Sequence, residues 1–286
     1  MVDIEVPEVD YTEYTNRQLA AVPLAVLAVA LLVIAAWYVM TGTPVKLGMT
    51  FTGGTEIRVT TGDSLATVRD TFSGLPYDSI TPVGTGDAYL LETQETDTAA
   101  YQQVAEAAGY DVPLVQTVSP TLGASAQQQA LFGVGLAFVG MSVLVFVLFR
   151  SFIPSIAIVI SAFSDIMIPV AIMNVFGIEL SLGTVAALLM LIGYSVDSDI
   201  LLNNHIRRRR GGFYESAYRA MRTGVTMTLT SIVAMVVMTI TATLFGIQLL
   251  AAIGTVLVFG LATDLMNTYM LNLSLLRWYK FKGVNR

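Results

Sequence analysis

Six long apolar runs dominate this 286-residue sequence and restrict the folds open to it. Each meets the length of about 20 apolar residues that crossing the hydrocarbon core of a bilayer requires. Only 13% of the residues are charged, against roughly a quarter in soluble domains. The sequence therefore predicts an α-helical membrane protein with six transmembrane helices, at approximately 20–40, 129–149, 153–176, 181–203, 224–245 and 247–276.

The basic residues between the runs predict the orientation. The segment 41–128 carries Lys46, Arg58 and Arg69 against ten acidic residues. Cytoplasmic segments carry the excess of Lys and Arg, so we expect the termini, 1–19 and 277–286, in the cytoplasm of a multi-pass cell-membrane protein. Segment 41–128 is then extracytoplasmic, and 129–276 forms a five-helix region. The basic residues that set this orientation are Arg150, Arg207–Arg210, Arg219, Arg222, Arg277, Lys280, Lys282 and Arg286.

The segment between the first two runs reads as a small α+β domain. Strands are predicted at Thr55–Val59 and Val112–Val118, and at Ser79–Val83 and Ala88–Glu92 on either side of the turn residues Gly84, Gly86 and Asp87. Helices are expected at Ser64–Phe72, with Asp63 as the N-cap, and at Thr98–Ala108. The order βαββαβ is that of a ferredoxin-like domain. It contains no His and no Cys, and nothing in it indicates catalysis.

Ionisable side chains inside the apolar runs are the candidate functional residues. Each costs about 2.5–3.5 kcal/mol at a helix centre on insertion scales. Two residues apart on a helix means a rotation of about 200°, so Asp197 and Asp199 point to different faces. The alternative is that both are hydrated at the cytoplasmic end of their helix. The ion-coupling candidates are Asp165, Asp197, Asp199, Asp264 and Arg222.

Polar side chains at helical spacing accompany these charges. Such stripes either hydrate an ion route or pack helices tightly, and periodicity alone favours packing. Arg222 has the further alternative of an anchor that extends to the membrane surface. The supporting residues are Tyr194, Ser195 and Ser198 in the fourth run, Thr223, Thr226, Thr230 and Ser231 in the fifth, and Thr268, between Asp264 and Asn272, in the sixth.

Four motifs in this order resemble the SecD/SecF family of protein-export membrane proteins, within the RND superfamily, over essentially the whole chain. The first contains Gly48, Phe51, Gly53 and Gly54, with Met49-Thr50 where the family has an acid. The second begins at Gly193-Tyr194-Ser195, and Ser198 occupies the family's acidic position, so that Asp197 or Asp199 takes its role. The third contains Arg222-Thr223 and Thr230-Ser231, and the fourth matches only at Gly254-Thr255.

The resemblance implies a six-helix RND-type half-bundle. Its partners are a SecD-like six-helix subunit that completes the bundle, a SecY-type channel, exported unfolded polypeptide and the lipid bilayer. It further implies coupling to the proton or sodium motive force. The polar stripes are then expected at the seam with the second half, which would bury Asp197 or Asp199, Arg222 and Asp264.

Three other functions remain open on the sequence. An intramembrane aspartyl protease needs two facing aspartates, but its G-x-G-D pattern is absent. An RND exporter of small molecules or lipids is a second alternative, although the lack of a large second external lobe argues against drug efflux. The third is a translocon assembly scaffold without ion coupling, in which the polar residues only pack the helices. We expect no enzymatic activity, no cofactor, no metal site and no nucleic-acid partner.

Overall fold

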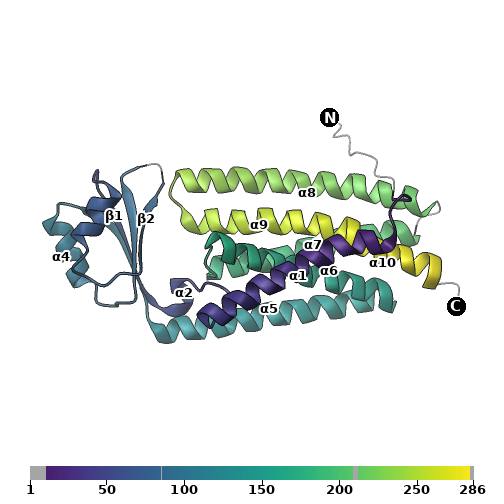
Figure 1. The fold of residues 1–286 in the computed structure, drawn as a ribbon, viewed down its shortest axis with the longest axis horizontal. Helices are drawn as coiled ribbons and strands as arrows, with labels where there is room; N and C mark the ends of the chain where they lie inside the picture. The colour runs from purple at the N-terminus through teal and green to yellow at the C-terminus, as the bar shows by residue number, and fades with distance from the viewer. Residues whose placement is uncertain (1–10, 85, 209–211, 284–286) are drawn as a thin grey trace.

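The computed structural model describes residues 11–84, 86–208 and 212–283. Within these ranges, six helices are long and apolar enough to cross a membrane, and they run side by side along the long axis of the molecule (Figure 1). This confirms the expected fold class. They are α1 (Asn16–Thr41), α5 (Pro120–Phe149), α6 (Phe152–Phe176), α7 (Leu182–Arg208), α8 (Phe213–Leu244) and a last helix that begins with α9 (Gln248–Met266).

The last helix changes its winding where its polar residues lie. After α9 it continues as the π-helix η1 (Asn267–Asn272), then as α10 (Leu273–Trp278) and η2 (Tyr279–Gly283). Short π-helical turns inside α-helices occur frequently at functional sites.

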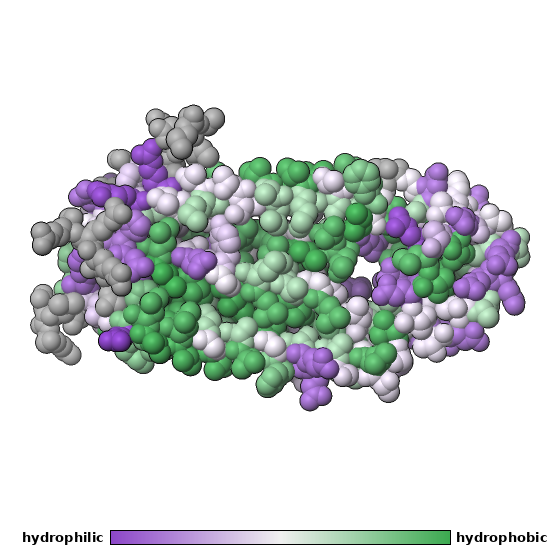
Figure 2. All heavy atoms as spheres, turned by 180° about the vertical axis from the view of Figure 1, so that it is seen from behind, coloured by the Kyte–Doolittle hydropathy of each residue, from purple (hydrophilic) through white to green (hydrophobic). Residues whose placement is uncertain are grey.

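The helices form an inner and an outer group. Apolar residues of α6, α7 and α9 make up most of the largest core, and α1, α5 and α8 expose most of their apolar side chains. The space-filling view shows the same division, with a hydrophobic surface over the helices and hydrophilic residues towards the two ends (Figure 2). Exposed side chains as apolar as these suit a lipid environment, and the chain is a multi-pass membrane protein.

A small lobe, residues 54–118, lies at one end of the helices. Its strands are β1 (Gly54–Thr60), β2 (Ser79–Val83), β3 (Ala88–Thr93) and β4 (Asp111–Val118). They pair antiparallel in the order β2-β3-β1-β4, the ferredoxin-like arrangement expected from βαββαβ. Helices α3 (Leu65–Thr71) and α4 (Ala99–Ala107) cover the sheet face that points away from the membrane helices (Figure 1).

The residue that caps α3 differs from the one expected. The Ser64 side chain accepts from the Thr67 N–H, whereas the Asp63 carboxylate accepts from the Tyr110 hydroxyl at 2.8 Å. Asp63 is thus held by a tertiary contact, and the next residue takes the cap.

A glycine-rich joint connects the lobe to the bundle. It contains the four-residue helix α2 (Met49–Thr52) and the buried Phe51. Gly53 and Gly54 have φ of 80° and 122°, a region that favours glycine. A Cβ on Gly54 would lie 2.5 Å from the Thr93 carbonyl oxygen. The two glycines therefore allow the chain to turn here and to pass close to the backbone of Thr93.

Two helices begin earlier than the apolar runs indicate. α8 begins at Phe213 instead of 224, so Arg222 lies inside this helix and does not open it. Its first turns are amphipathic: Phe213, Ala217 and Ala220 are buried in a cluster with Leu273 and Leu276 of α10. α5 begins at Pro120, where Ser119 caps it.

Candidate functional site

Three aspartates meet in the interior of the helix bundle. Asp165 of α6 is 1% exposed, and Asp199 of α7 and Asp264 of α9 are fully buried. Each sits in an inner helix, because the polar side of α6, α7 and α9 turns inwards at this level. All the side chains that the structure shows bonded to them come from this chain.

Asp165 accepts two short hydrogen bonds from different helices. The Ser195 hydroxyl of α7 donates to one carboxylate oxygen, and the Asn267 amide of η1 donates to the other, both at 2.6 Å. Asp165 thereby joins all three inner helices.

Asp199 and Asp264 share one donor. The Thr268 hydroxyl lies 2.9 Å from Oδ1 of Asp199 and 3.3 Å from Oδ1 of Asp264, and with one hydrogen it donates to one of them at a time. The Asn272 amide also donates to Asp199, at 2.7 Å. The side chains of η1 therefore hold these two carboxyl groups in one network.

The network leaves several buried polar atoms without a hydrogen-bond partner. Among the described residues, the acceptors are Oδ2 of Asp199 and of Asp264 and the amide oxygens of Asn203, Asn267 and Asn272, and the hydroxyls of Ser161 and Ser164 beside Asp165 are also unpartnered. A buried acceptor without a partner costs about 1–3 kcal/mol. A proton on either carboxyl group would turn an acceptor into a donor and relieve this deficit. No group of three or more His, Cys, Asp or Glu in the described ranges is arranged to hold a metal ion.

The other polar candidates lie on the surface of the bundle. Asp197 is exposed on α7, and Arg222, Thr223 and Thr230 are exposed on α8. The seam was expected to bury Asp264 and one of the two acids of α7. That is wrong for Asp199 and Asp264, because both are buried inside this chain.

Most hydroxyl side chains in the polar stripe of α8 form hydrogen bonds within α8 and not with other helices. Thr223, Thr226 and Thr230 donate to backbone carbonyls of their own helix. Tyr194 and Ser231 form the contact with α7, at 3.0 Å between hydroxyl oxygens. Ser198 is half-buried and donates to the Tyr194 carbonyl.

Sequence reasoning does not single out Ser161 and Ser164, both fully buried in α6 beside Asp165. Their spacing in the sequence could have indicated them, since Ser161 precedes Asp165 by four residues and so lies on the same side of the helix.

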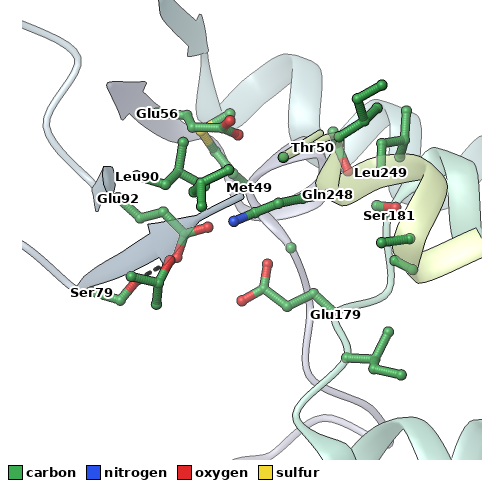
Figure 3. Close-up of a pocket in the computed structure, with 18 of the residues that line it drawn as sticks. Met49, Thr50, Glu56, Ser79, Leu90, Glu92, Glu179, Ser181, Gln248 and Leu249 are labelled. Carbon is green, nitrogen blue, oxygen red and sulfur yellow. Dashed lines mark hydrogen bonds between the residues drawn. The ribbon is translucent and has the colours of Figure 1, made fainter. Parts of the chain in front are cut away.

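A cleft of about 750 Å³ separates the lobe from the ends of the membrane helices, and Figure 2 shows a hollow at this place. One wall is the sheet face without helices; the other includes the α6–α7 and α8–α9 connections (Figure 3). Gln248, Glu179, Glu56 and Glu92 line it.

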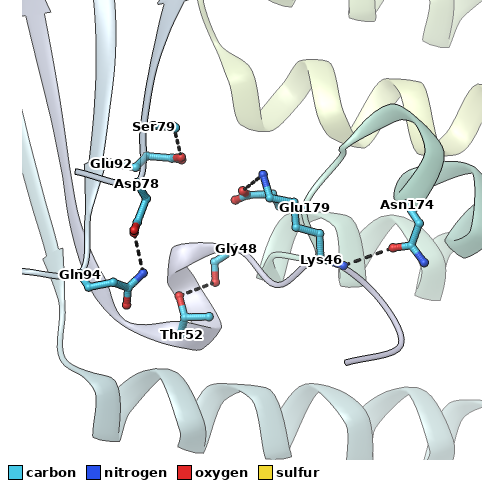
Figure 4. A network of polar contacts seen from close by, with 9 residues as sticks. All are labelled: Lys46, Gly48, Thr52, Asp78, Ser79, Glu92, Gln94, Asn174 and Glu179. Carbon is cyan, nitrogen blue, oxygen red and sulfur yellow. Dashed lines mark hydrogen bonds and ion pairs between the residues drawn. The ribbon is translucent and has the colours of Figure 1, made fainter. Parts of the chain in front are cut away.

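The segment after α1 fixes the floor of this cleft (Figure 4). Lys46 forms an ion pair with Glu179 at 2.8 Å, which raises the pKa of the lysine. Its backbone N–H donates to Asn174, and the Leu180 N–H donates to the Lys46 carbonyl at 2.7 Å. Gly48 packs against Glu179, where a Cβ would lie 3.0 Å from the carboxylate.

Comparison with known proteins assigns the family. The family model described as protein export membrane protein SecD/SecF, C-terminal, matches residues 99–282. The chain belongs to the SecD/SecF family of protein-export membrane proteins. Protein-export membrane protein SecF of Haloferax volcanii is 67% identical over the full length of both chains, and that of Methanolacinia petrolearia is 43% identical over 96% of this chain and 97% of the relative.

The fold also matches a solved SecD/SecF structure. The crystal structure of SecDF, described as a translocon-associated membrane protein, from Thermus thermophilus has a TM-score of 0.73 at 21% identity. The match covers 98% of this chain and 39% of that chain. The likeness supports the six-helix and lobe architecture, and this chain corresponds to a part of the longer one.

Proposed function

We propose that this chain is an accessory subunit of protein export that acts with a SecD-like six-helix partner on a SecY-type channel. Membership of the SecD/SecF family supports an export role, and the 39% coverage of the Thermus chain supports a further partner. The exposed polar groups of α7 and α8, including Asp197 and Arg222, are the surface we assign to this partner. Charged groups on a lipid-facing surface are costly, and a partner helix would cover them.

The termini lie in the cytoplasm in this proposal, and the lobe lies outside. The excess of Lys and Arg in the connections at the end opposite the lobe supports this orientation. It exposes the cleft to the side on which an exported polypeptide emerges.

The proton or sodium motive force drives conformational change through the buried aspartates. The observation that carries this proposal is the shared Thr268 hydroxyl between Asp199 and Asp264. Protonating one carboxyl group frees the hydroxyl for the other and removes a charge from the bundle interior. One charge moved across 100 mV is worth about 2.3 kcal/mol, enough to bias two states a few kcal/mol apart.

Vesicles containing this chain, its copurified six-helix partner and the channel test the proposal. We expect translocation to fall several-fold when ionophores collapse the ion gradient. Translocation at the same rate with and without the ion gradient would favour the alternative function, a translocon scaffold without ion coupling. Failure to copurify any multi-pass partner would refute the shared bundle.

A further inference from the structure

The membrane-facing side of the lobe carries two glutamates in direct opposition. Glu56 on β1 pairs in register with Glu92 on β3. Ser79 flanks Glu92, and Gln116 flanks Glu56, so one polar row crosses all four strands. Like charges directly opposite each other on neighbouring strands destabilise a sheet. The fold alone gives no reason for this placement.

Two basic residues line the same cleft: Arg58 attracts Glu56, and Lys46 attracts Glu92. In the part of the chain that the structure describes, neither glutamate forms an ion pair with them. Glu92 accepts from the Ser79 hydroxyl at 2.7 Å. Burial raises the pKa of both carboxyl groups, and the charge of Glu92 raises that of Glu56 further.

A third carboxylate faces this pair across the cleft. Glu179 comes from the α6–α7 connection, and its partner Lys46 lies beside it on the floor (Figures 3 and 4). Apolar side chains, among them Met49, Leu90 and Leu249, also line the cleft. The cleft thus combines apolar surface with three carboxylates, which outnumber its two basic residues, Lys46 and Arg58.

The dimensions of the cleft suit an organic group. The cleft measures about 750 Å³, within the roughly 300–1,000 Å³ range of sites for organic ligands. The carboxylates are too dispersed to form a metal-binding group among the described residues. An alkylammonium or guanidinium group on a flexible stem fits both the charge and the spacing.

We propose that this cleft binds a lysine or arginine side chain of an extended polypeptide that passes between the lobe and the membrane. The cationic group donates to Glu56 and Glu92, and its aliphatic stem packs against Leu90 and Met49, as long basic side chains do on apolar surfaces. The bound charge offsets the repulsion between the glutamates. The choice of a polypeptide rests on the proposed export function.

Peptide binding to the full chain in lipid nanodiscs tests this inference. The probe is a short fluorescent Gly/Ser-rich peptide with two arginines, compared with the same peptide carrying glutamines or glutamates, and anisotropy gives the affinity. We expect the arginine peptide to bind about five- to tenfold more tightly than the glutamine peptide. Glu56→Gln and Glu92→Gln should each remove most of this difference. The matched control is Glu106→Gln, an exposed change on α4 behind the sheet, which should leave it intact.

Three further readouts exclude a merely structural effect. Glu56→Gln removes a repulsion, so its thermal unfolding midpoint should equal or exceed that of the unaltered chain. Glu56→Lys should reverse the preference in favour of the glutamate peptide. Arginine amide should compete far more weakly than the arginine peptide.

Equal binding of arginine and glutamine peptides would overturn the proposal, as would loss of the difference in Glu106→Gln. Loss of binding that accompanies a lower unfolding midpoint in both glutamine variants would also overturn it. Equal competition by arginine amide would refute a polypeptide as the occupant. The assay contains neither partner nor channel, so its failure is distinguishable from failure in the translocation assay.

Discussion

Asp197 and Asp199 lie two residues apart on α7 and occupy different environments. Asp199 is fully buried and accepts from Thr268 and Asn272, whereas Asp197 is exposed. We expect Asp199→Asn to reduce secretion at least tenfold, because an amide cannot exchange a proton with Thr268 and Asp264. Asp197→Asn should reduce it less than threefold (about 0.7 kcal/mol at 1.4 kcal/mol per tenfold). Secretion of a reporter in cells with equal membrane levels of each variant measures both, and equal effects would argue against a relay on one face of α7.

Arg222 stands on the exposed side of α8, three turns into the helix. Its proposed role is electrostatic, at the surface that meets the partner. Arg222→Ala should therefore lower secretion while leaving membrane insertion and copurification of the partner unchanged. Arg222→Lys is the control, since it keeps the charge without the planar guanidinium. Full secretion by Arg222→Ala would remove this residue from the coupling mechanism.

At the scale of elements, the glutamate row of the sheet predicts a pH dependence. The pKa of Glu56 and of Glu92 is raised above the ordinary value of 4.5 in the folded lobe, so the folded state holds these protons more tightly than the unfolded state. The free energy of unfolding of the lobe then falls as the pH rises from 4.5 through the raised pKa values of the two glutamates. Hydrogen exchange of β1 and β3 amides, corrected for intrinsic rates, should show greater protection at about pH 5 than at about pH 7. In Glu56→Gln the difference in protection between the two pH values should be smaller. Greater protection at about pH 7 than at about pH 5 in the unaltered chain would contradict the raised pKa values of the two glutamates.

The elements themselves were largely predictable from sequence. The strands follow short runs of β-branched, aromatic and aliphatic residues between turn residues, and the six helices follow the length of the apolar runs. Both signals are local in the sequence. The start of α8 was not predictable from hydropathy, since Phe213 and Ala217 lie in an amphipathic stretch whose apolar side packs on α10. The Asp264, Thr268 and Asn272 stripe was visible in the spacing. Its contacts with Asp199 were not, because they depend on how α7 and η1 pack.

At the scale of the whole molecule, polar groups are divided between the interior and the surface of one half-bundle. The three buried aspartates accept hydrogen bonds from side chains inside this bundle, whereas exposed polar groups of α7 and α8 form the surface that we assign to the partner. The α6–α7 connection and the first turns of α9 line the cleft, so a conformational change in the interior can reach the lobe through them. In the proposed function, ion exchange in the interior is thereby separated from contact with the partner.

The chain contains no cysteine, so single cysteines can map the partner surface directly. Thr230→Cys places a thiol on the exposed stripe of α8, and Val139→Cys places one on α5 at a side chain that is 58% exposed. With a short bifunctional crosslinker in native membranes, Thr230→Cys should form an adduct with the six-helix partner in high yield. Val139→Cys should remain uncrosslinked to it, since α5 faces lipid in this arrangement. An adduct from Val139→Cys and none from Thr230→Cys would contradict this assignment, because it would place the partner against α5 and leave the exposed polar side of α7 and α8 outside the subunit contact.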